Sequence, residues 1–394
     1  MTLLALLDHL PFQHDWATPR GAVIAIVGIF FGAYWIRSFL FAIIDQLLPP
    51  TRTLPTVSKP AGHGFREAMR EGKTKYPGKA WVIPFQDPTV ILPLETLDTQ
   101  IKKIPEPDLT LNGNMYKRFF GQYTQVGTDM HELVDALKFD LSQGVHGLLG
   151  VMAEEITYGY DKVVGKPANW TSFPTYQILL QIVALTSGRV FVGLPLSRTD
   201  EWVQASIQHT MGSVYFSDKL RSYFPLLRPL VGPFLRERKA VSAVQETVAR
   251  LLDPIISEKR PLSFSSSTGN GGFKAKRQTS SKKCEDEAGR ITSWLLGRYA
   301  KKADEPPKSS RLVRDHLTLS FAAVHVASMA LTHVLHDLAI RPEYMNMLRA
   351  ELEAEMNKFR SKDGSIVLDS KSLANLVKMD SFIKESLRLN PSGI

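Results

Sequence analysis

The chain has 394 residues, 44% of them hydrophobic and 22% charged, so it is long enough for one large core or two domains. Its single cysteine, Cys284, excludes an intrachain disulfide and a cysteine-based zinc site. The formal charge of +9 is concentrated in residues 259–284, which contain no acid between their basic residues. These are Lys259, Arg260, Lys274, Lys276, Arg277, Lys282 and Lys283. We interpret this stretch as a solvated loop and expect no nucleic-acid partner.

The most hydrophobic stretch is residues 21–48, which follows an amino-terminal tail, 1–20. Its uncharged run, 21–36, would form about 24 Å of helix, short of the roughly 30 Å hydrocarbon core of a bilayer. Continuing to Ile44 gives about 36 Å with one internal charge, Arg37, which can reach the membrane surface. We predict a membrane anchor helix over 21–48. A buried helix of a soluble core is the alternative.

The residues around this stretch orient the anchor and connect it to the body. Tyr34 and Trp35 suit a membrane interface. Arg37, Arg52 and Lys59 lie on the carboxyl side, so the positive-inside rule places the body in the cytosol, although Arg20 reduces the asymmetry. Residues 49–62 predict a stiff hinge because they contain four prolines: Pro49, Pro50, Pro55 and Pro60.

The body, 63–394, reads as mostly α with a small β portion, in one large domain. Residues 63–73 predict a helix, and the apolar runs 80–85 and 89–93 predict a hairpin. Helical spacing dominates from 128 onward. The further predicted helices are 172–196, which is almost uncharged, 200–216, 241–259 and 311–340. The Ser/Gly/Lys-rich stretch 261–289 predicts a disordered basic loop.

Several catalytic patterns are incomplete. HELVD, 131–135, lacks the second histidine of a zinc-protease helix. Gly159 to Lys166 is one residue too long for a phosphate loop and continues with proline. His325, His333 and His336 share a helix without a carboxylate at ligand spacing, so we predict no metal site there. Asn169 begins a glycosylation sequon, which would be used only if the domain were lumenal.

Glu385 and Arg388 stand three residues apart in KMDSFIKESLRLNP, 378–391, so they share a helix face and can pair. The apolar stripe of the same helix comes from Met379, Phe382, Ile383 and Leu387. The E-x-x-R spacing is common in this chain, since it recurs at Glu67/Arg70 and at Glu287/Arg290. The spacing alone therefore assigns no function.

The order of segments is more specific: an anchor, a proline hinge, a hairpin, many helices, a very long helix with AAVHVAS, 322–328, and the E-x-x-R helix. This order resembles the cytochrome P450 family of haem-thiolate monooxygenases, particularly its membrane-bound fungal members of secondary metabolism. LQIVALTSGRVFVGLPLSRTDEW, 180–202, and 378–391 carry the resemblance most specifically. It implies a cytochrome P450-like fold, a haem cofactor, an NADPH-cytochrome reductase partner and the endoplasmic reticulum membrane.

The resemblance also implies roles for individual residues. Glu385 and Arg388 match the pair that holds the core beside the haem, and Lys138 weakly matches the basic residue that meets a haem propionate. Residues 322–327 match the oxygen-activation groove, where Ala323 is the usual small residue and His325 replaces the usual acid. The proton-relaying Thr or Ser of that groove is replaced, because Val326 and Ala327 occupy its place and Ser328 follows one step later.

The family's cysteine loop, F-x-x-G-x-x-x-C-x-G, does not occur in 1–394, and Cys284 lacks its glycine frame. The fold is therefore expected to be incomplete at its carboxyl end. We expect the chain as given to be a catalytically inert relative, because the cysteine ligand is absent and Val326 and Ala327 replace the proton relay. The alternative is a fragment of an active monooxygenase that hydroxylates a small hydrophobic metabolite, such as a terpenoid or polyketide. A membrane-tethered interaction protein is the non-enzymatic alternative, and the missing thiolate ligand makes haem retention doubtful.

Overall fold

The computed structural model describes residues 27–40, 53–58, 65–84, 88–105, 108–128, 130–265, 290–302, 309–358 and 370–391. These residues are mostly helical, with a single two-stranded sheet among them, as predicted. The chain divides into two compact units. Unit 1 comprises Met1–Leu109 and Arg221–Val231, and unit 2 comprises Thr110–Leu220 and Gly232–Ile394. The body predicted over 63–394 therefore includes residues of both units, because its residues up to Leu109 belong to unit 1.

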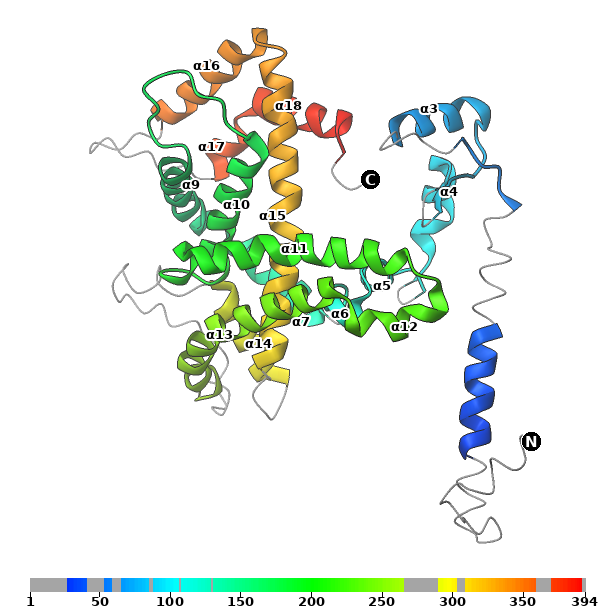
Figure 1. The fold of residues 1–394 in the computed structure, drawn as a ribbon. Helices are drawn as coiled ribbons and strands as arrows, with labels where there is room; N and C mark the ends of the chain where they lie inside the picture. The colour runs from blue at the N-terminus through cyan, green and yellow to red at the C-terminus, as the bar shows by residue number, and fades with distance from the viewer. Residues whose placement is uncertain are drawn as a thin grey trace, which may run out of the picture. The chain divides into compact units, whose positions relative to one another are not determined.

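Unit 1 contains the amino-terminal helix and the hairpin. The described part of the predicted anchor is a helix over Val27–Leu40, whose large apolar side chains, such as Phe30 (73%) and Ile29 (70%), are exposed. It is the unlabelled dark blue helix of Figure 1. The further elements of unit 1 are α3 (Phe65–Lys75), β1 (Trp81–Ile83), β2 (Thr89–Ile91), α4 (Leu94–Thr99), η2 (Ile101–Lys103), η6 (Pro225–Leu227) and α12 (Arg228–Val231).

The predicted hairpin is confirmed, and part of the predicted hinge is attached to it. β1 and β2 pair antiparallel, with Trp81 opposite Ile91. On the other side of β1, the Val57 amide donates to the Val82 carbonyl at 3.1 Å, and the Val82 amide donates to the Pro55 carbonyl at 2.9 Å. Val57 is buried with Trp81 in a small apolar cluster. Within the described residues 53–58, the hinge therefore adds backbone pairing to the hairpin instead of acting only as a spacer.

Unit 2 is built from helices. Its first part contains α5 (Leu111–Arg118), α6 (Gly121–Thr124), α7 (His131–Asp135), the π-helix η3 (Ala136–Leu141), α8 (Ser142–Gly144), η4 (Val145–Gly147), α9 (Leu149–Val163), α10 (Thr175–Phe191) and η5 (Leu196–Arg198). The rest contains α11 (Asp200–Arg221), η7 (Gly232–Phe234), α13 (Arg236–Ser265), α14 (Arg290–Lys302), α15 (Ser309–Ala339), α16 (Glu343–Lys358), α17 (Ser370–Ala374) and α18 (Val377–Leu389).

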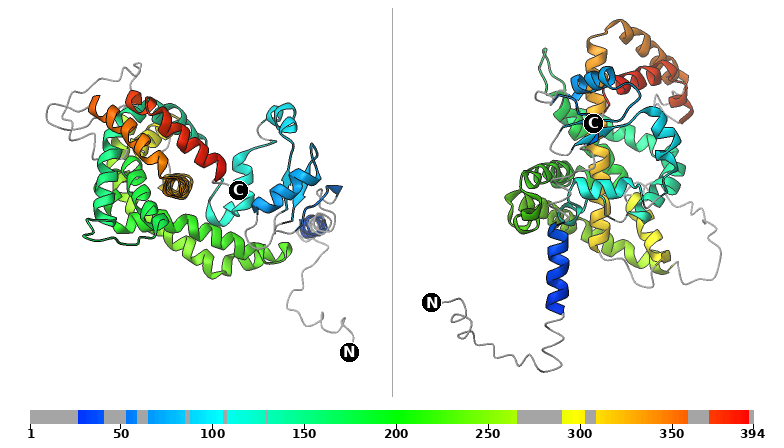
Figure 2. Two further views of the ribbon diagram at one scale, coloured as in Figure 1. Left: turned by 90° about the horizontal axis from the view of Figure 1, so that it is seen from above. Right: turned by 90° about the vertical axis from the view of Figure 1, so that its right-hand side faces the viewer.

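The long helix α15 is the centre of unit 2 (Figure 1). It packs against α10, α13 and α18, and the left view of Figure 2 shows it nearly along its axis with α16 and α18 beside it. Leu312, Leu319 and Val324 bury its apolar positions in the core. Helix α15 is also long and apolar enough to cross a membrane, but it packs as a core helix against α10, α13 and α18. Pro342 follows its end, and proline cannot continue a helix.

Several predicted boundaries differ from the structure. Helix α11 continues past 216 to Arg221, and α13 begins at Arg236 instead of 241. The helix predicted over 172–196 ends at Phe191, because Gly193 adopts a left-handed φ of 75° and its amide donates back to the Gly188 carbonyl at 3.2 Å. The loop predicted over 261–289 is wrong at its start, since α13 continues to Ser265. Residues 266–289, with Cys284, lie outside the described part of the chain.

Candidate functional site

The segment of α15 predicted to form the oxygen-activation groove presents two different faces. Val326 is 46% exposed, and Ala323 and Ala327 are partly exposed. His325 and Ser328 are buried on the side that packs into the helical core. This separation follows from the 100° turn per residue of a helix. The exposed positions are thus small or apolar, while the polar positions face inward.

His325 is held by two other helices. Its Nε2 lies 3.1 Å from the Ile207 carbonyl of α11, and its Nδ1 lies 2.8 Å from the Tyr176 hydroxyl of α10. A carbonyl only accepts, so Nε2 carries the proton and Nδ1 accepts from Tyr176. Burial holds the pKa of His325 below its ordinary value. The chain of bonds ends at a backbone carbonyl, so His325 acts as a neutral link between helices.

Ser328 offers no hydroxyl to the exposed face. Its Oγ donates to the Val324 carbonyl at 2.7 Å within the same helix, and the side chain is fully buried. Val326 and Ala327 have no exchangeable side-chain proton. At these three positions, therefore, no exchangeable side-chain proton reaches the exposed face of α15.

Replacing His325 by alanine is expected to lower the free energy of unfolding by about 2 kcal/mol at pH 8, because it leaves the Ile207 carbonyl and the Tyr176 hydroxyl unpaired. His336→Ala, an exposed histidine on the same helix, should change it by less than about 0.5 kcal/mol. Unfolding in urea at several pH values measures both. Since the folded-state pKa of His325 is lowered, the stability that His325 contributes to the parent is lost as the pH falls below 6.5, and the difference from His325→Ala should shrink there. Equal effects of the two variants would contradict the linking role.

Glu385 and Arg388 form the predicted ion pair on α18. Arg388 Nη2 lies 2.6 Å from Glu385 Oε1, and Arg388 Nε lies 2.7 Å from Oε2. The hydrogen bond from Arg388 lowers the pKa of Glu385. The side chains are 56% and 67% exposed among the described residues. The pair is therefore solvated here, and its own contribution to stability is small.

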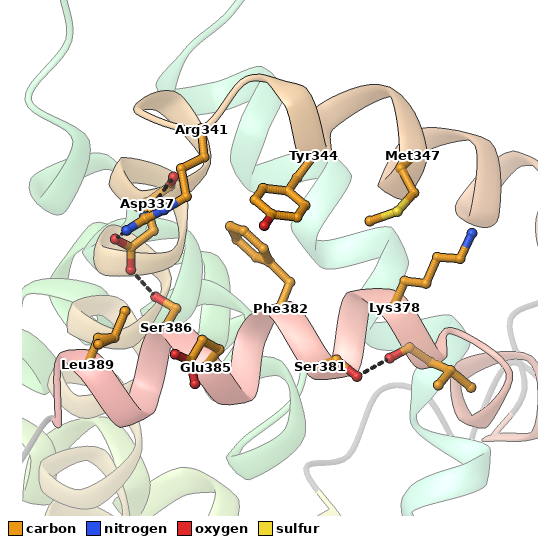
Figure 3. A pocket seen from close by; sticks show the side chains of 11 residues that line it. Asp337, Arg341, Tyr344, Met347, Lys378, Ser381, Phe382, Glu385, Ser386 and Leu389 are labelled. Atoms are coloured by element: carbon orange, nitrogen blue, oxygen red, sulfur yellow. Dashed lines mark hydrogen bonds and ion pairs between the residues drawn. The ribbon is translucent and has the colours of Figure 1, made fainter.

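A groove of about 460 Å³ runs beside this pair between α18, α16 and the end of α15 (Figure 3). Tyr344 and Phe382 face each other across it, with ring centroids 5.7 Å apart. At one end, Asp337 accepts a hydrogen bond from Ser386 at 2.6 Å. Asp337 carries no motif, and the sequence analysis missed it. The remaining lining residues include Arg341, Met347, Val377, Lys378 and Leu389.

The other predicted positions lie apart from this groove. Lys138 is exposed on the π-helix η3, with its Nζ 5.5 Å from the centroid of the Phe139 ring. Asn169 lies in the connection between α9 and α10, where Trp170 is fully exposed. Neither Lys138 nor Asn169 lines the groove beside α18.

Comparisons with known proteins agree with this architecture. The family model for cytochrome P450 matches residues 148–394, and the chain therefore belongs to the cytochrome P450 family. It is 34% identical to cytochrome P450 monooxygenase ascG of Acremonium egyptiacum over 90% of this chain and 65% of the relative. It is 29% identical to cytochrome P450 monooxygenase gliF of Aspergillus fumigatus over 93% of this chain and 70% of the relative.

Solved structures show the same fold. The crystal structure of the cytochrome P450DA heme domain matches with a TM-score of 0.54 and 12% identity, covering 85% of this chain and 69% of that chain. The predicted fold and family are thus confirmed. The chain spans about two thirds of the length of the curated relatives named above.

The family implies haem, and the described residues fit part of a haem site. Val326 supplies an exposed apolar surface on α15, but the chain's only cysteine, Cys284, lies outside the described residues. Both ring nitrogens of His325 are engaged, so this histidine cannot bind iron. In the described ranges no three His, Cys, Asp or Glu side chains gather at metal-binding distance. The described residues therefore offer an apolar wall and no cysteine thiolate.

Proposed function

We propose that the protein to which this chain belongs is a membrane-anchored haem-thiolate monooxygenase of fungal secondary metabolism. Its membership of the cytochrome P450 family and its fungal monooxygenase relatives support this proposal. The structural observation that carries it is the exposed apolar face of α15 at Val326, on the helix against which the E-x-x-R helix α18 packs. A small hydrophobic metabolite, such as a terpenoid or polyketide, suits such a face.

The cellular setting follows from the same proposal. The exposed apolar side chains of the Val27–Leu40 helix support a membrane anchor. The body then faces the cytosol at the endoplasmic reticulum, where an NADPH-cytochrome reductase supplies electrons. In this orientation the sequon at Asn169 is unused, because glycosylation takes place in the lumen.

When bound, the haem supplies oxygen activation, and the protein's side chains shape the surroundings. Val326 and Ala327 give their face of α15 an apolar surface and offer no proton. His325 keeps its proton on Nε2, which donates to the Ile207 carbonyl, so it orients α15 and delivers no proton to the exposed face at Val326. We propose that residues 1–394 alone do not oxidise a substrate, since the described residues hold no thiolate ligand and this face holds no hydroxyl. An active longer form remains the alternative.

A carbon-monoxide difference spectrum of purified 1–394, reconstituted with haem and reduced, tests this proposal. We expect no thiolate-type absorption band. The matched control is Cys284→Ser, which removes the chain's only thiol. A thiolate-type band in the parent that disappears in Cys284→Ser would overturn the proposed inactivity and identify Cys284 as the ligand.

A further inference from the structure

Helix α18 carries the E-x-x-R pair, and its first turn is held by a residue of another helix. The side chain of its N-cap residue, Leu376, makes no capping hydrogen bond. Instead, Glu351 of α16 accepts from the backbone amides of Lys378 and Met379, each at 2.9 Å. First-turn amides have no partner within the helix, and a carboxylate there also complements the helix dipole. Glu351 thus fixes the amino end of α18.

The other end of α18 is held by Asp337 of α15. Asp337 Oδ2 accepts from the Ser386 hydroxyl at 2.6 Å and from the Asn390 side-chain amide at 3.0 Å. Its second oxygen, Oδ1, accepts from Arg341 at 3.0 Å. The bond from Ser386 is the main cause that lowers the pKa of Asp337. Ser386 is buried, and Figure 3 shows it pointing to Asp337 across the helix interface.

These two attachments determine the rotation of α18. At 100° per residue, Glu385 and Arg388 lie roughly 100–160° around the helix from Ser386. While Ser386 faces Asp337, the pair must therefore face away from α15. The exposure of both side chains, 56% and 67%, agrees with this geometry. A rotation by one residue would separate Ser386 from Asp337 and turn the pair elsewhere.

We propose that Glu351 and Asp337 are positioning residues that set the axial place and rotation of α18, and thereby the direction in which Glu385 and Arg388 face. The importance of that direction for the monooxygenase rests on the proposed function. The placement of α18 by Glu351 and Asp337 is independent of the proposed function. Its test requires neither haem nor catalytic activity.

Hydrogen–deuterium exchange of the full chain in detergent provides the first readout. Glu351→Ala should lower the protection of the amides at 378–379 roughly tenfold or more, because each loses a charge-assisted acceptor. Glu351→Gln should restore part of it, since its amide oxygen still accepts. Glu353→Gln, an exposed glutamate on the same helix, is the matched control and should change nothing. A peptide from α10 reports general destabilisation.

The distance between two spin labels provides the second readout. The loss of a contact that only stabilises the fold would not change this distance. Labels at Gln177 and Lys384, both exposed, are placed in a Cys284→Ser background. Asp337→Ala and Ser386→Ala should each broaden or shift the distance distribution, and Ser386→Ala leaves α15 untouched. An unchanged distribution in both variants, or an equal loss of exchange protection in α10 and α18, would overturn the proposal. A narrow distribution in the parent together with a selective change at α18 would support it.

Discussion

Replacing Glu155 by glutamine is expected to lower the free energy of unfolding by about 3–5 kcal/mol, the cost of breaking a buried ion pair on one side. Glu155 of α9 has no exposed side-chain surface. Its Oε2 lies 2.7 Å from Arg198 Nη2, and its Oε1 lies 3.0 Å from Arg198 Nε. The buried Arg189 of α10 approaches the same carboxylate at 4.0 Å. Neutralising Glu155 removes the carboxylate closest to Arg198 and weakens its attraction for Arg189, while Arg198 keeps only a more distant contact with the exposed Glu154.

The neighbouring Glu154 is the matched control. It lies 3.7 Å from the same Arg198, but its side chain is 60% exposed, so Glu154→Gln should cost less than about 1 kcal/mol. Urea unfolding followed by circular dichroism measures both values. Similar losses for the two variants, or a loss below 1 kcal/mol for Glu155→Gln, would contradict the role of the buried pair.

The different roles of these two glutamates illustrate what the sequence does not contain. Glu154 and Glu155 are adjacent, and helical periodicity cannot say which one meets an arginine 43 residues later. Arg198 reaches Glu155 only after the chain has turned at Gly193, and its guanidinium lies 3.8 Å from the centroid of the Tyr158 ring. The stretch 180–202 was predicted to be characteristic of the family. Its physical function as an anchor for α9 became visible only in three dimensions.

Local patterns predicted most of the fold. The hairpin, α11, α13 and the long α15 were all predicted from apolar spacing and from turn residues. The misplaced end of α10 shows the limit, because Val192, Gly193 and Leu194 continue an apolar pattern that a left-handed glycine interrupts. Periodicity records which residues are apolar and does not record where the backbone turns.

The site was predictable where it depends on spacing within one helix. The three-residue separation of Glu385 and Arg388 predicted their contact. The partners of His325 were not predictable, since Tyr176 is 149 residues away and Ile207 contributes only a backbone carbonyl. Asp337 was missed for the same reason, because its partner Ser386 belongs to a different helix, α18, and its partner Asn390 directly follows that helix.

A buried acid on α15 has a pH signature of its own. Asp315 is 1% exposed and accepts a hydrogen bond from the Tyr299 hydroxyl. Burial is the main cause that raises the pKa of Asp315 to about 6 from 3.8. The charged neighbours are Arg314, whose Nε lies 3.7 Å from Asp315 Oδ1, and Arg311, which stacks on Tyr299 and pairs with Glu132. These cations do not offset the desolvation of the carboxylate.

The sign of the effect follows from proton linkage. The folded protein holds the Asp315 proton up to about pH 6, whereas the unfolded chain releases it near 3.8. Between these values the folded state binds more protons, so the free energy of unfolding falls as the pH rises. Asp315→Asn removes this dependence. Relative to the parent, the variant should gain on the order of 3 kcal/mol between pH 4 and pH 7.

The measurement is the difference in unfolding free energy between Asp315→Asn and the parent at several pH values. Another buried group, His209, acts oppositely in this range, because burial lowers its pKa to about 4 from 6.5, so its contribution is lost as the pH falls. Both chains contain His209, so its effect cancels in the difference. A difference that stays flat from pH 4 to pH 7 would show that Asp315 is ionised in the folded protein throughout. The Tyr299 hydrogen bond would then stabilise the carboxylate more than its burial destabilises it.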